Sequence, residues 1–233
     1  MSAKGSNLSH THMLKDMQRE GWGRINRQRL RFITRYAGHS ILDVGCARGD
    51  YVTFLNKHGH QSMGVDLLAY QDWQQVRPQF FIQGDLPHLP FPSQSFDTLL
   101  AFEVLEHIPK PDLALQEFFR VSRKNLIISV PDCAMNDDLL RAGLVYTHWL
   151  DLSHCNFFNQ ETLRIILEEN GFRVEVLTNI NQILPDFIPL RSWHFPYKLA
   201  FHLSRLMARL PLRKQYRMTI LAVASKNSNE IRS

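Results

Sequence analysis

The sequence is poor in the residues that build disulfide frameworks and structural metal sites. Among its 233 residues there are only three cysteines, Cys46, Cys133 and Cys155, and no two of them form a CxxC pair. An odd number of scattered cysteines argues against both a disulfide framework and a zinc ribbon. It favours a reducing compartment, and we therefore expect a cytoplasmic protein.

Long apolar runs, repeats and low-complexity tracts are also missing. No uninterrupted apolar stretch approaches the roughly 20 residues that a membrane-spanning helix needs. The first residues, MSAKGSNLSHTHMLKDMQRE, lack the apolar core of a secretory signal and carry two acids. With 44% hydrophobic and 11% aromatic residues, the composition nevertheless predicts a folded core.

Acidic residues are scarce in two segments of the chain. Residues 1–38 hold eight Lys or Arg against two acids, and residues 181–217 hold seven against one. The middle, residues 39–180, is acidic, with eighteen acids against ten bases. The net charge of +5 thus comes from segments that flank an acidic middle. These basic segments are candidates for contact with anionic partners, and the alternative is that they are solvated surfaces.

Apolar segments alternate with helical patterns along most of the chain. Alternation of this kind predicts an α/β fold, a parallel sheet covered by helices on both faces. Ligands of such sheets bind beyond the carboxyl ends of the strands, where Gly45, Asp66, Asp85 and Phe102 would lie. We expect strands at 40–44, 61–67, 80–84, 96–102, 125–130, 173–178 and 217–224, and helices at 51–58, 69–76, 112–122, 159–170 and 196–210.

The stretch ILDVGCARGD places a glycine turn directly after the first expected strand. A dinucleotide site would need G-x-G-x-x-G, but Ala47 replaces the middle glycine, which disfavours a pyrophosphate ligand. The Lys-Ser/Thr pair of a Walker loop does not follow, so that loop is excluded. Asp43 before the turn suits a cationic ligand, Asp66 could accept hydrogen bonds from a ribose diol, and Asp85 could meet an adenine amino group. S-adenosylmethionine combines these three features without a phosphate.

At these residues the sequence resembles the class I S-adenosylmethionine-dependent methyltransferases, in the small-molecule branch related to ubiquinone and menaquinone methyltransferases. The resemblance is carried by ILDVGCARGD, GVDL, GDLPHLPFPSQSFDTLLAFEVLEHIPKP and NLIISVPD, and it extends through FNQETLRIILEENGFRVE. It implies a Rossmann-like, seven-stranded sheet with an antiparallel last strand. It also implies a cofactor site made by Asp43, Gly45, Cys46, Ala47, Gly49, Asp66, Leu67, Gly84, Asp85, Leu86, Phe102, Glu103 and His107. The alternative is an ordinary strand-to-helix turn in which the acids cap helices.

A histidine-rich segment, YTHWLDLSHCNFF, is the first candidate for acceptor chemistry. His148 and His154 are the candidate catalytic bases, and Asp151 could orient an imidazole. Tyr146 and Trp149 could form an acceptor wall. The alternative is a structural lid that is held by hydrogen bonds of buried histidines.

A second cluster, FEVLEHIPKP, contains Glu103, Glu106 and His107. With His154 as a fourth ligand, these residues could bind a divalent metal. In most of the branch that the chain resembles, however, this motif forms a cofactor wall and helix, so we expect no metal.

The segment 181–216 is an insertion where the resemblance implies a short hairpin. Its helical pattern over 196–210 places Leu199, Leu203, Leu206 and Leu210 on one stripe, and Lys198, His202, Arg205 and Arg209 on another. We expect the leucines to pack on the domain or to form a lid. Peripheral contact with a membrane surface and a dimer face are the alternatives.

Together these observations predict a basic helical segment at 1–38, a methyltransferase domain at 39–225 that carries the insertion, and a tail at 226–233. The predicted function is methyl transfer from S-adenosylmethionine to a small or lipid-like acceptor at oxygen, in the cytoplasm and with membrane association as an option. An RNA methyltransferase is the rival enzyme, although the acidic middle argues against nucleic acid as a partner. A non-catalytic scaffold that binds the cofactor is the rival from another class.

Overall fold

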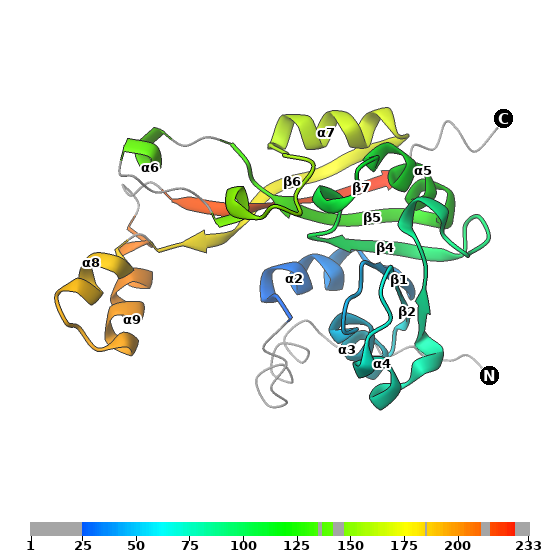
Figure 1. Cartoon of the computed structure of the whole chain (residues 1–233), viewed down its shortest axis with the longest axis horizontal. Coiled ribbons are helices and arrows are strands. Elements are labelled where there is room, and N and C mark those ends of the chain that lie inside the picture. The colour runs from blue at the N-terminus through cyan, green and yellow to red at the C-terminus, as the bar shows by residue number, and fades with distance from the viewer. Residues whose placement is uncertain (1–24, 135–136, 142–146, 185, 211–214, 227–233) are drawn as a thin grey trace.

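Seven strands form one mixed sheet in the computed structural model, which describes residues 25–134, 137–141, 147–184, 186–210 and 215–226 (Figure 1). The order of the strands is β3-β2-β1-β4-β5-β7-β6, and β7 runs antiparallel to both of its neighbours. This topology confirms the predicted fold class. The strands are β1 (Ser40–Val44), β2 (Gln61–Asp66), β3 (Phe81–Gln83), β4 (Phe96–Phe102), β5 (Ser122–Pro131), β6 (Phe172–Ile183) and β7 (Tyr216–Lys226).

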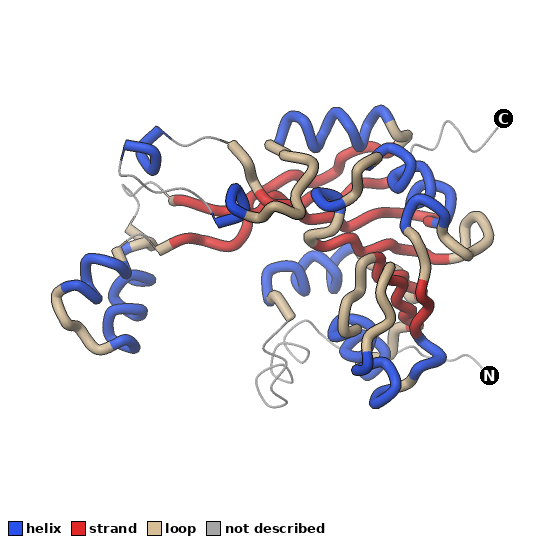
Figure 2. Tube along the Cα trace, in the orientation of Figure 1, coloured by secondary structure: helices blue, strands red, loops and turns tan. Residues whose placement is uncertain are grey.

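Helices cover both faces of this sheet, with α2, α3 and α4 on one side and α5 and α7 on the other (Figures 1 and 2). The described helices are α2 (Arg27–Tyr36), α3 (Asp50–Lys57), α4 (Gln71–Val76), α5 (Pro111–Val121), α6 (Asp137–Arg141), α7 (Gln160–Glu169), α8 (Phe187–Ser192) and α9 (Tyr197–Met207). Short 3-10 turns lie at Pro78–Phe80, Leu86–His88, Leu105–His107 and Thr147–Leu150.

Alternate residues of each central strand supply the two halves of the core, because successive side chains of a strand point to opposite faces. In β4, Leu99 and Ala101 pack in the cluster with α5 and α7, whereas Leu100 packs in the cluster with α2 and α3. All three are fully buried. This two-sided burial explains why the sequence of β4 is almost continuously apolar.

The predicted start of α7 is confirmed at Asn159. Its side chain accepts a hydrogen bond of 2.8 Å from the backbone N–H of Thr162, and the Thr162 hydroxyl accepts one of 2.9 Å from the backbone N–H of Asn159. This reciprocal pair satisfies two backbone donors that the helix itself leaves unpaired.

Strands β6 and β7 extend well beyond the body of the domain as a two-stranded ribbon (Figure 2). Strand β6 was expected to end at 178, but it pairs with β7 as far as Ile183 and Tyr216. The extended part of β6 and β7 has a weaker apolar pattern than the central strands, because most of its side chains are only partly buried. Helices α8 and α9 sit at the tip of this ribbon, away from the sheet's helical layers (Figure 1).

The expectation that the leucines of α9 pack on the domain is wrong for Leu199, Leu206 and Leu210, which are exposed, whereas Leu203 is partly buried. The buried face of α9 is formed by the small residues Ala200 and Ser204, followed by Ala208, whereas Leu199 and Leu206 are 46% and 61% exposed. These small residues recur at every fourth position. Helices α8 and α9 also contact each other through Phe187 and Tyr197, whose ring centroids lie 5.3 Å apart. Three of the four leucines of the stripe therefore face outward, and their role as a lid stays a prediction. In the described ranges, no helix combines the length and apolar character needed to cross a bilayer.

Candidate functional site

The glycine turn after β1 brings the backbone close to the loop that follows β4. Gly45 has φ +71°, and its N–H donates a 2.8 Å hydrogen bond to the Val65 carbonyl. A Cβ on Gly45 would lie 2.5 Å from a methyl carbon of Val104, so a side chain does not fit there. Gly49, with φ +82°, then begins α3. Ala47 also has positive φ, which keeps the turn tight without a third glycine.

The carboxylate of Asp66 is fixed at the end of β2 by two backbone donors. One oxygen accepts a 2.8 Å hydrogen bond from the N–H of Ala47, and the other accepts a 3.1 Å bond from the N–H of Leu68. Each carboxylate oxygen has further lone pairs for a ligand. Asp66 is thereby oriented by the same turn that carries Gly45.

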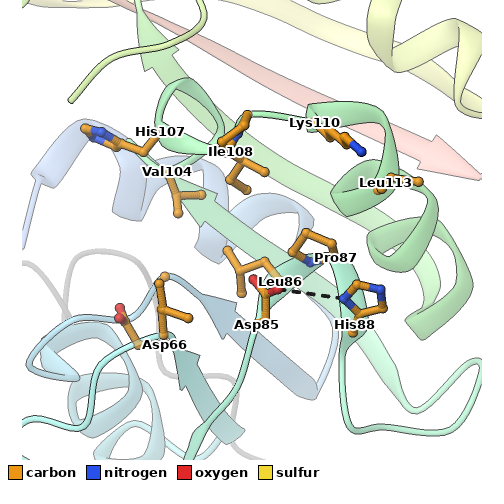
Figure 3. Close-up of a pocket in the computed structure, with 13 residues that line it drawn as sticks. Asp66, Asp85, Leu86, Pro87, His88, Val104, His107, Ile108, Lys110 and Leu113 are labelled. Carbon is orange, nitrogen blue, oxygen red and sulfur yellow. Dashed lines mark ion pairs between the residues drawn. The ribbon is translucent and has the colours of Figure 1, made fainter. Parts of the chain in front are cut away.

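A cavity of about 470 Å³ opens beside these residues. Figure 3 shows Asp66 and Asp85 on one side of it, and Val104, His107 and Ile108 on the other. The mostly apolar walls and a few polar groups suit a ligand with an adenine ring. The lining residues are Gly45, Asp66, Leu67, Asp85, Leu86, Pro87, His88, Val104, His107, Ile108, Pro109, Lys110 and Leu113, and six of them are predicted cofactor residues.

The other predicted cofactor residues do not line this cavity, and they are Asp43, Cys46, Ala47, Gly49, Gly84, Phe102 and Glu103. The Cys46 side chain packs in the core with Val52, Trp73 and Phe81, and burial raises the pKa of its thiol. Only the backbone of Cys46 is therefore available to a ligand.

Burial, with a further contribution from Asp66, raises the pKa of Asp43 to about 8.

Arg29 of α2 is a site residue that the sequence reasoning did not single out. Its guanidinium lies 5.0 Å from the ring centroid of Phe102 and forms an ion pair with Glu103. The Ser129 hydroxyl donates a 3.0 Å hydrogen bond to the same carboxylate. The sequence predicted a basic helical segment at 1–38, but nothing in it selected Arg29 among the eight bases of that segment.

A second cavity of about 430 Å³ adjoins the first, and His107 lines both. The structure here brings together the three predicted catalytic residues, His148, Asp151 and His154. The full lining is Glu103, Glu106, His107, Pro131, His148, Asp151, His154, Met218 and Thr219. Trp149 is not in this lining and stacks on Phe157 instead, with centroids 4.9 Å apart. Tyr146 lies outside the described residues.

The two sequence clusters form one wall because backbone hydrogen bonds join them. The carbonyl of Glu106 accepts bonds of 2.9 and 3.1 Å from the N–H groups of Cys155 and Asn156. The Asn156 amide also donates a 2.7 Å bond to the carbonyl of Ile108. These bonds fix the histidine segment against the loop after β4.

Burial in the second cavity favours the neutral forms of His148 and Glu106, whereas Asp151 is held in its charged form. Burial lowers the pKa of His148, so its imidazole is neutral near pH 7. Burial and the neighbouring charge of Glu103 raise the pKa of Glu106 to about 8. The exposed Asp151 carboxylate lies 3.6 Å from Nε2 of His154, and hydrogen bonds from Ser153 lower the pKa of Asp151.

Three residues of this wall could hold a metal ion. Glu106, His107 and His154 each place one ligand atom within 4.8 Å of the others. Glu103, which the sequence suggested as another ligand, is engaged by Arg29 and Ser129.

This strand order, with a cavity lined by Asp66 and Asp85 beyond the parallel strands, is that of the class I S-adenosylmethionine-dependent methyltransferases. A family model described as a methyltransferase domain matches residues 13–177, and the chain belongs to this family. These findings confirm the predicted class, and they confirm S-adenosylmethionine as the cofactor.

Three of the relatives that the chain matches are named O-methyltransferases. The chain is 34% identical to the ubiquinone biosynthesis O-methyltransferase of Coxiella burnetii over 206 residues, which cover 78% of this chain and 80% of that protein. It is 32% identical to the malonyl-[acyl-carrier protein] O-methyltransferase of Yersinia pestis over 98 residues, 40% of this chain. It is also 32% identical to the O-methyltransferase resE of Aspergillus sclerotiorum over 158 residues, 62% of this chain. The matches span only 36% of the Yersinia protein and 58% of the Aspergillus protein.

Solved structures share the fold at low sequence identity. A SAM-dependent methyltransferase from Archaeoglobus fulgidus aligns with a TM-score of 0.63 at 18% identity, covering 94% of this chain and all of that one. The magnesium protoporphyrin IX methyltransferase of Synechocystis, solved with bound SAH, aligns with a TM-score of 0.57 at 14% identity, covering 91% and 86%.

Proposed function

We propose that this chain transfers a methyl group from S-adenosylmethionine to an oxygen atom of a small, hydrophobic or lipid-like acceptor. The observation that carries the proposal is the shared wall at His107, which joins a donor cavity to a second cavity rich in histidine and carboxylate. The two reactants would meet across this wall. The O-methyltransferase names of the relatives from Coxiella and Aspergillus also support oxygen as the acceptor atom.

The residues of the first cavity fit this donor. Asp66 would bind the ribose hydroxyls and Asp85 the adenine amino group. Arg29, which pairs with Glu103 outside the lining of this cavity, would bind the methionine carboxylate. The absent side chain at Gly45 leaves its backbone open to the ligand. S-adenosylmethionine supplies a methyl group that is already activated on a sulfonium centre. The chain mainly orients the reactants and excludes water, and orientation alone can contribute about 7 kcal/mol.

His148 is the proposed base for the acceptor hydroxyl. Its imidazole is buried and its lowered pKa keeps it able to accept a proton. His148 would accept the hydroxyl proton as the acceptor oxygen bonds to the methyl group, which bound S-adenosylmethionine would supply while its sulfur keeps the electron pair of the broken S–CH₃ bond. Asp151 and His154 line the same cavity, where their pairing orients the His154 ring.

The exposed helical hairpin α8–α9 supports a lipid-like acceptor and peripheral contact with a membrane. Its outward apolar residues include Ile188, Trp193, Leu199, Leu206 and Leu210. Arg191, Lys198, Arg205 and Arg209 accompany them, and no acid occurs between 187 and 210. Apolar and basic residues together suit the surface of an anionic bilayer. All three cysteines are unpaired, which supports a reducing, cytoplasmic location at such a surface.

Calorimetry and methyl incorporation test the proposed function together. We expect S-adenosylhomocysteine to bind the wild-type chain, and Asp66→Ala to lower the affinity by about tenfold or more because a charge-assisted pair of hydrogen bonds is lost. Glu161→Ala, which removes an exposed carboxylate on α7, is the control and leaves the affinity unchanged.

To identify the acceptor class, cell extracts are then incubated with the purified chain and the labelled methyl donor. The proposal expects label in the organic-solvent fraction. Label only in the RNA fraction would establish the rival RNA methyltransferase. Binding of S-adenosylhomocysteine without incorporation in any fraction would instead indicate a scaffold.

A further inference from the structure

We propose that Glu106, His107 and His154 bind one divalent transition-metal cation, such as Mn²⁺ or Zn²⁺, in the wall shared by the two cavities. The site uses one carboxylate and two imidazoles. It is distinct from the residues that would hold the methyl donor, apart from His107, which lines both cavities.

The first observation is the buried carboxylate of Glu106. The residue is 1% exposed, and among the described residues neither of its side-chain oxygens has a hydrogen-bond partner. A buried carboxylate without hydrogen bonds or a counter-charge is unfavourable, and proteins usually pair such a group or use it to coordinate a metal. Glu106 faces a cavity, so a bound cation would satisfy both oxygens at once.

The second observation is the position of the two histidine rings relative to Glu106. The rings of His107 and His154 meet edge to face, with centroids 4.7 Å apart. One potential ligand atom of each ring and one of the carboxylate all lie within 4.8 Å of one another. Donor atoms this close can converge on a single ion with small side-chain adjustments.

The third observation is that each ring has a polar partner for the nitrogen that would not bind metal. Nε2 of His154 lies 3.6 Å from the Asp151 carboxylate, while its Nδ1 is buried and has no partner in the described part of the chain. Nδ1 of His107 lies 3.3 Å from the carbonyl oxygen of Ser153. The Ser153 hydroxyl also donates a 2.5 Å hydrogen bond to Asp151. Metal-binding histidines characteristically donate their other N–H in this way, which fixes the tautomer and the ring orientation.

The ligand set also indicates the kind of ion and leaves room for a further ligand. Two imidazoles and a carboxylate suit Mn²⁺, Fe²⁺, Co²⁺ or Zn²⁺, whereas Mg²⁺ prefers oxygen ligands. Three protein ligands leave coordination positions open toward the cavity, as in catalytic metal sites. Metal binding itself does not depend on the proposed reaction. The role of the metal does rest on the proposed function: the ion would bind the acceptor oxygen and lower the pKa of the acceptor hydroxyl.

Metal titration of the full-length chain tests the site without any measurement of activity. After removal of metals with EDTA and dialysis, Mn²⁺ is added and the free ion is followed by electron paramagnetic resonance, and Zn²⁺ binding is measured by calorimetry. We expect one ion per chain. We expect metal binding to weaken by about tenfold or more for each of the ligand variants Glu106→Gln and His154→Gln. Asp151→Asn alters the partner of His154 and should weaken metal binding by about tenfold.

Glu161→Gln is the matched control, because it neutralises an exposed carboxylate on α7 and should bind metal as the wild type does. Thermal melts and the affinity for S-adenosylhomocysteine report whether each variant is folded. The proposal is overturned if the wild type shows no saturable binding, or if folded Glu106→Gln binds Mn²⁺ with unchanged affinity and stoichiometry. Loss of cofactor binding or of methyl transfer is measured separately, so failure of the proposed function is distinguished from failure of the metal site.

Discussion

At the scale of single residues, the site combines acids in contrasting environments. Asp66 at the end of β2 accepts two backbone hydrogen bonds and lines the first cavity. Asp43 in β1, in contrast, is buried and only 4% exposed. Their positions after and within parallel strands could be predicted, because the carboxyl ends of such strands share one edge. The ion pair between Arg29 and Glu103 could not be predicted from the sequence, because it joins residues that are 74 positions apart in the chain.

Asp43 gives the stability of the cofactor-free chain a specific pH dependence. Burial raises the pKa of Asp43 from 3.8 to about 8, so the folded state holds this proton more tightly than the unfolded state does. Its contribution to stability is full below pH 3.8 and is lost as the pH rises toward 8. The variant Asp43→Asn carries an amide at this position, which does not titrate in this range.

We therefore expect the free energy of unfolding of the wild type to fall relative to Asp43→Asn by about 2 kcal/mol or more between about pH 5 and pH 8. Urea denaturation at several pH values measures this difference. A difference that stays constant across the range would show that the pKa of Asp43 is not raised in the folded state.

At the scale of elements, the amphipathic pattern of α9 predicted a helix but misplaced its buried face. A leucine stripe usually marks the core side of a helix. Here Ala200 and Ser204, continued by Ala208, form the buried face, and three of the four leucines of the stripe face outward. The pattern alone does not tell a core-facing stripe from one that faces a bilayer, because both are apolar.

Substitutions on α9 test whether its exposed stripe binds a membrane. We expect the wild-type chain to float with anionic vesicles, and the double variant Leu199→Glu, Leu206→Glu to lose most of this binding because charged side chains oppose insertion. Ile165→Glu on α7, a residue that is likewise 46% exposed, is the control and should bind as the wild type does. Equal flotation of all three proteins would count against membrane contact through α9.

At the scale of the whole molecule, the hairpin is separate from the domain core. The three buried hydrophobic clusters of the described chain contain no residue between 187 and 210. The ribbon of β6 and β7 positions α8 and α9, and its last backbone pair joins Ile183 and Tyr216. The site, in contrast, depends on contacts between segments throughout the domain.

A variant in which residues 187–209 are replaced by a short glycine-containing turn should therefore keep the fold. We expect its melting temperature to change by no more than about 4 °C, because little core burial is lost. Affinity for S-adenosylhomocysteine should be unchanged, while vesicle flotation is lost. Thermal melts, calorimetry and flotation measure these properties, and loss of cofactor affinity would show that the hairpin supports the donor cavity.

The sequence by itself determined the class of fold and the cofactor, and it predicted the edge of the sheet where the candidate cofactor residues lie. These features follow from local signals: apolar strand patterns, the turn from Gly45 to Gly49, and acids at strand ends. Only the tertiary structure decided that His107 lines both cavities, that Glu106 is buried beside His154 without a hydrogen-bond partner among the described residues, and that most leucines of α9 face outward. The physical reason is that burial and proximity between distant segments arise from packing of the whole chain, which local patterns do not encode.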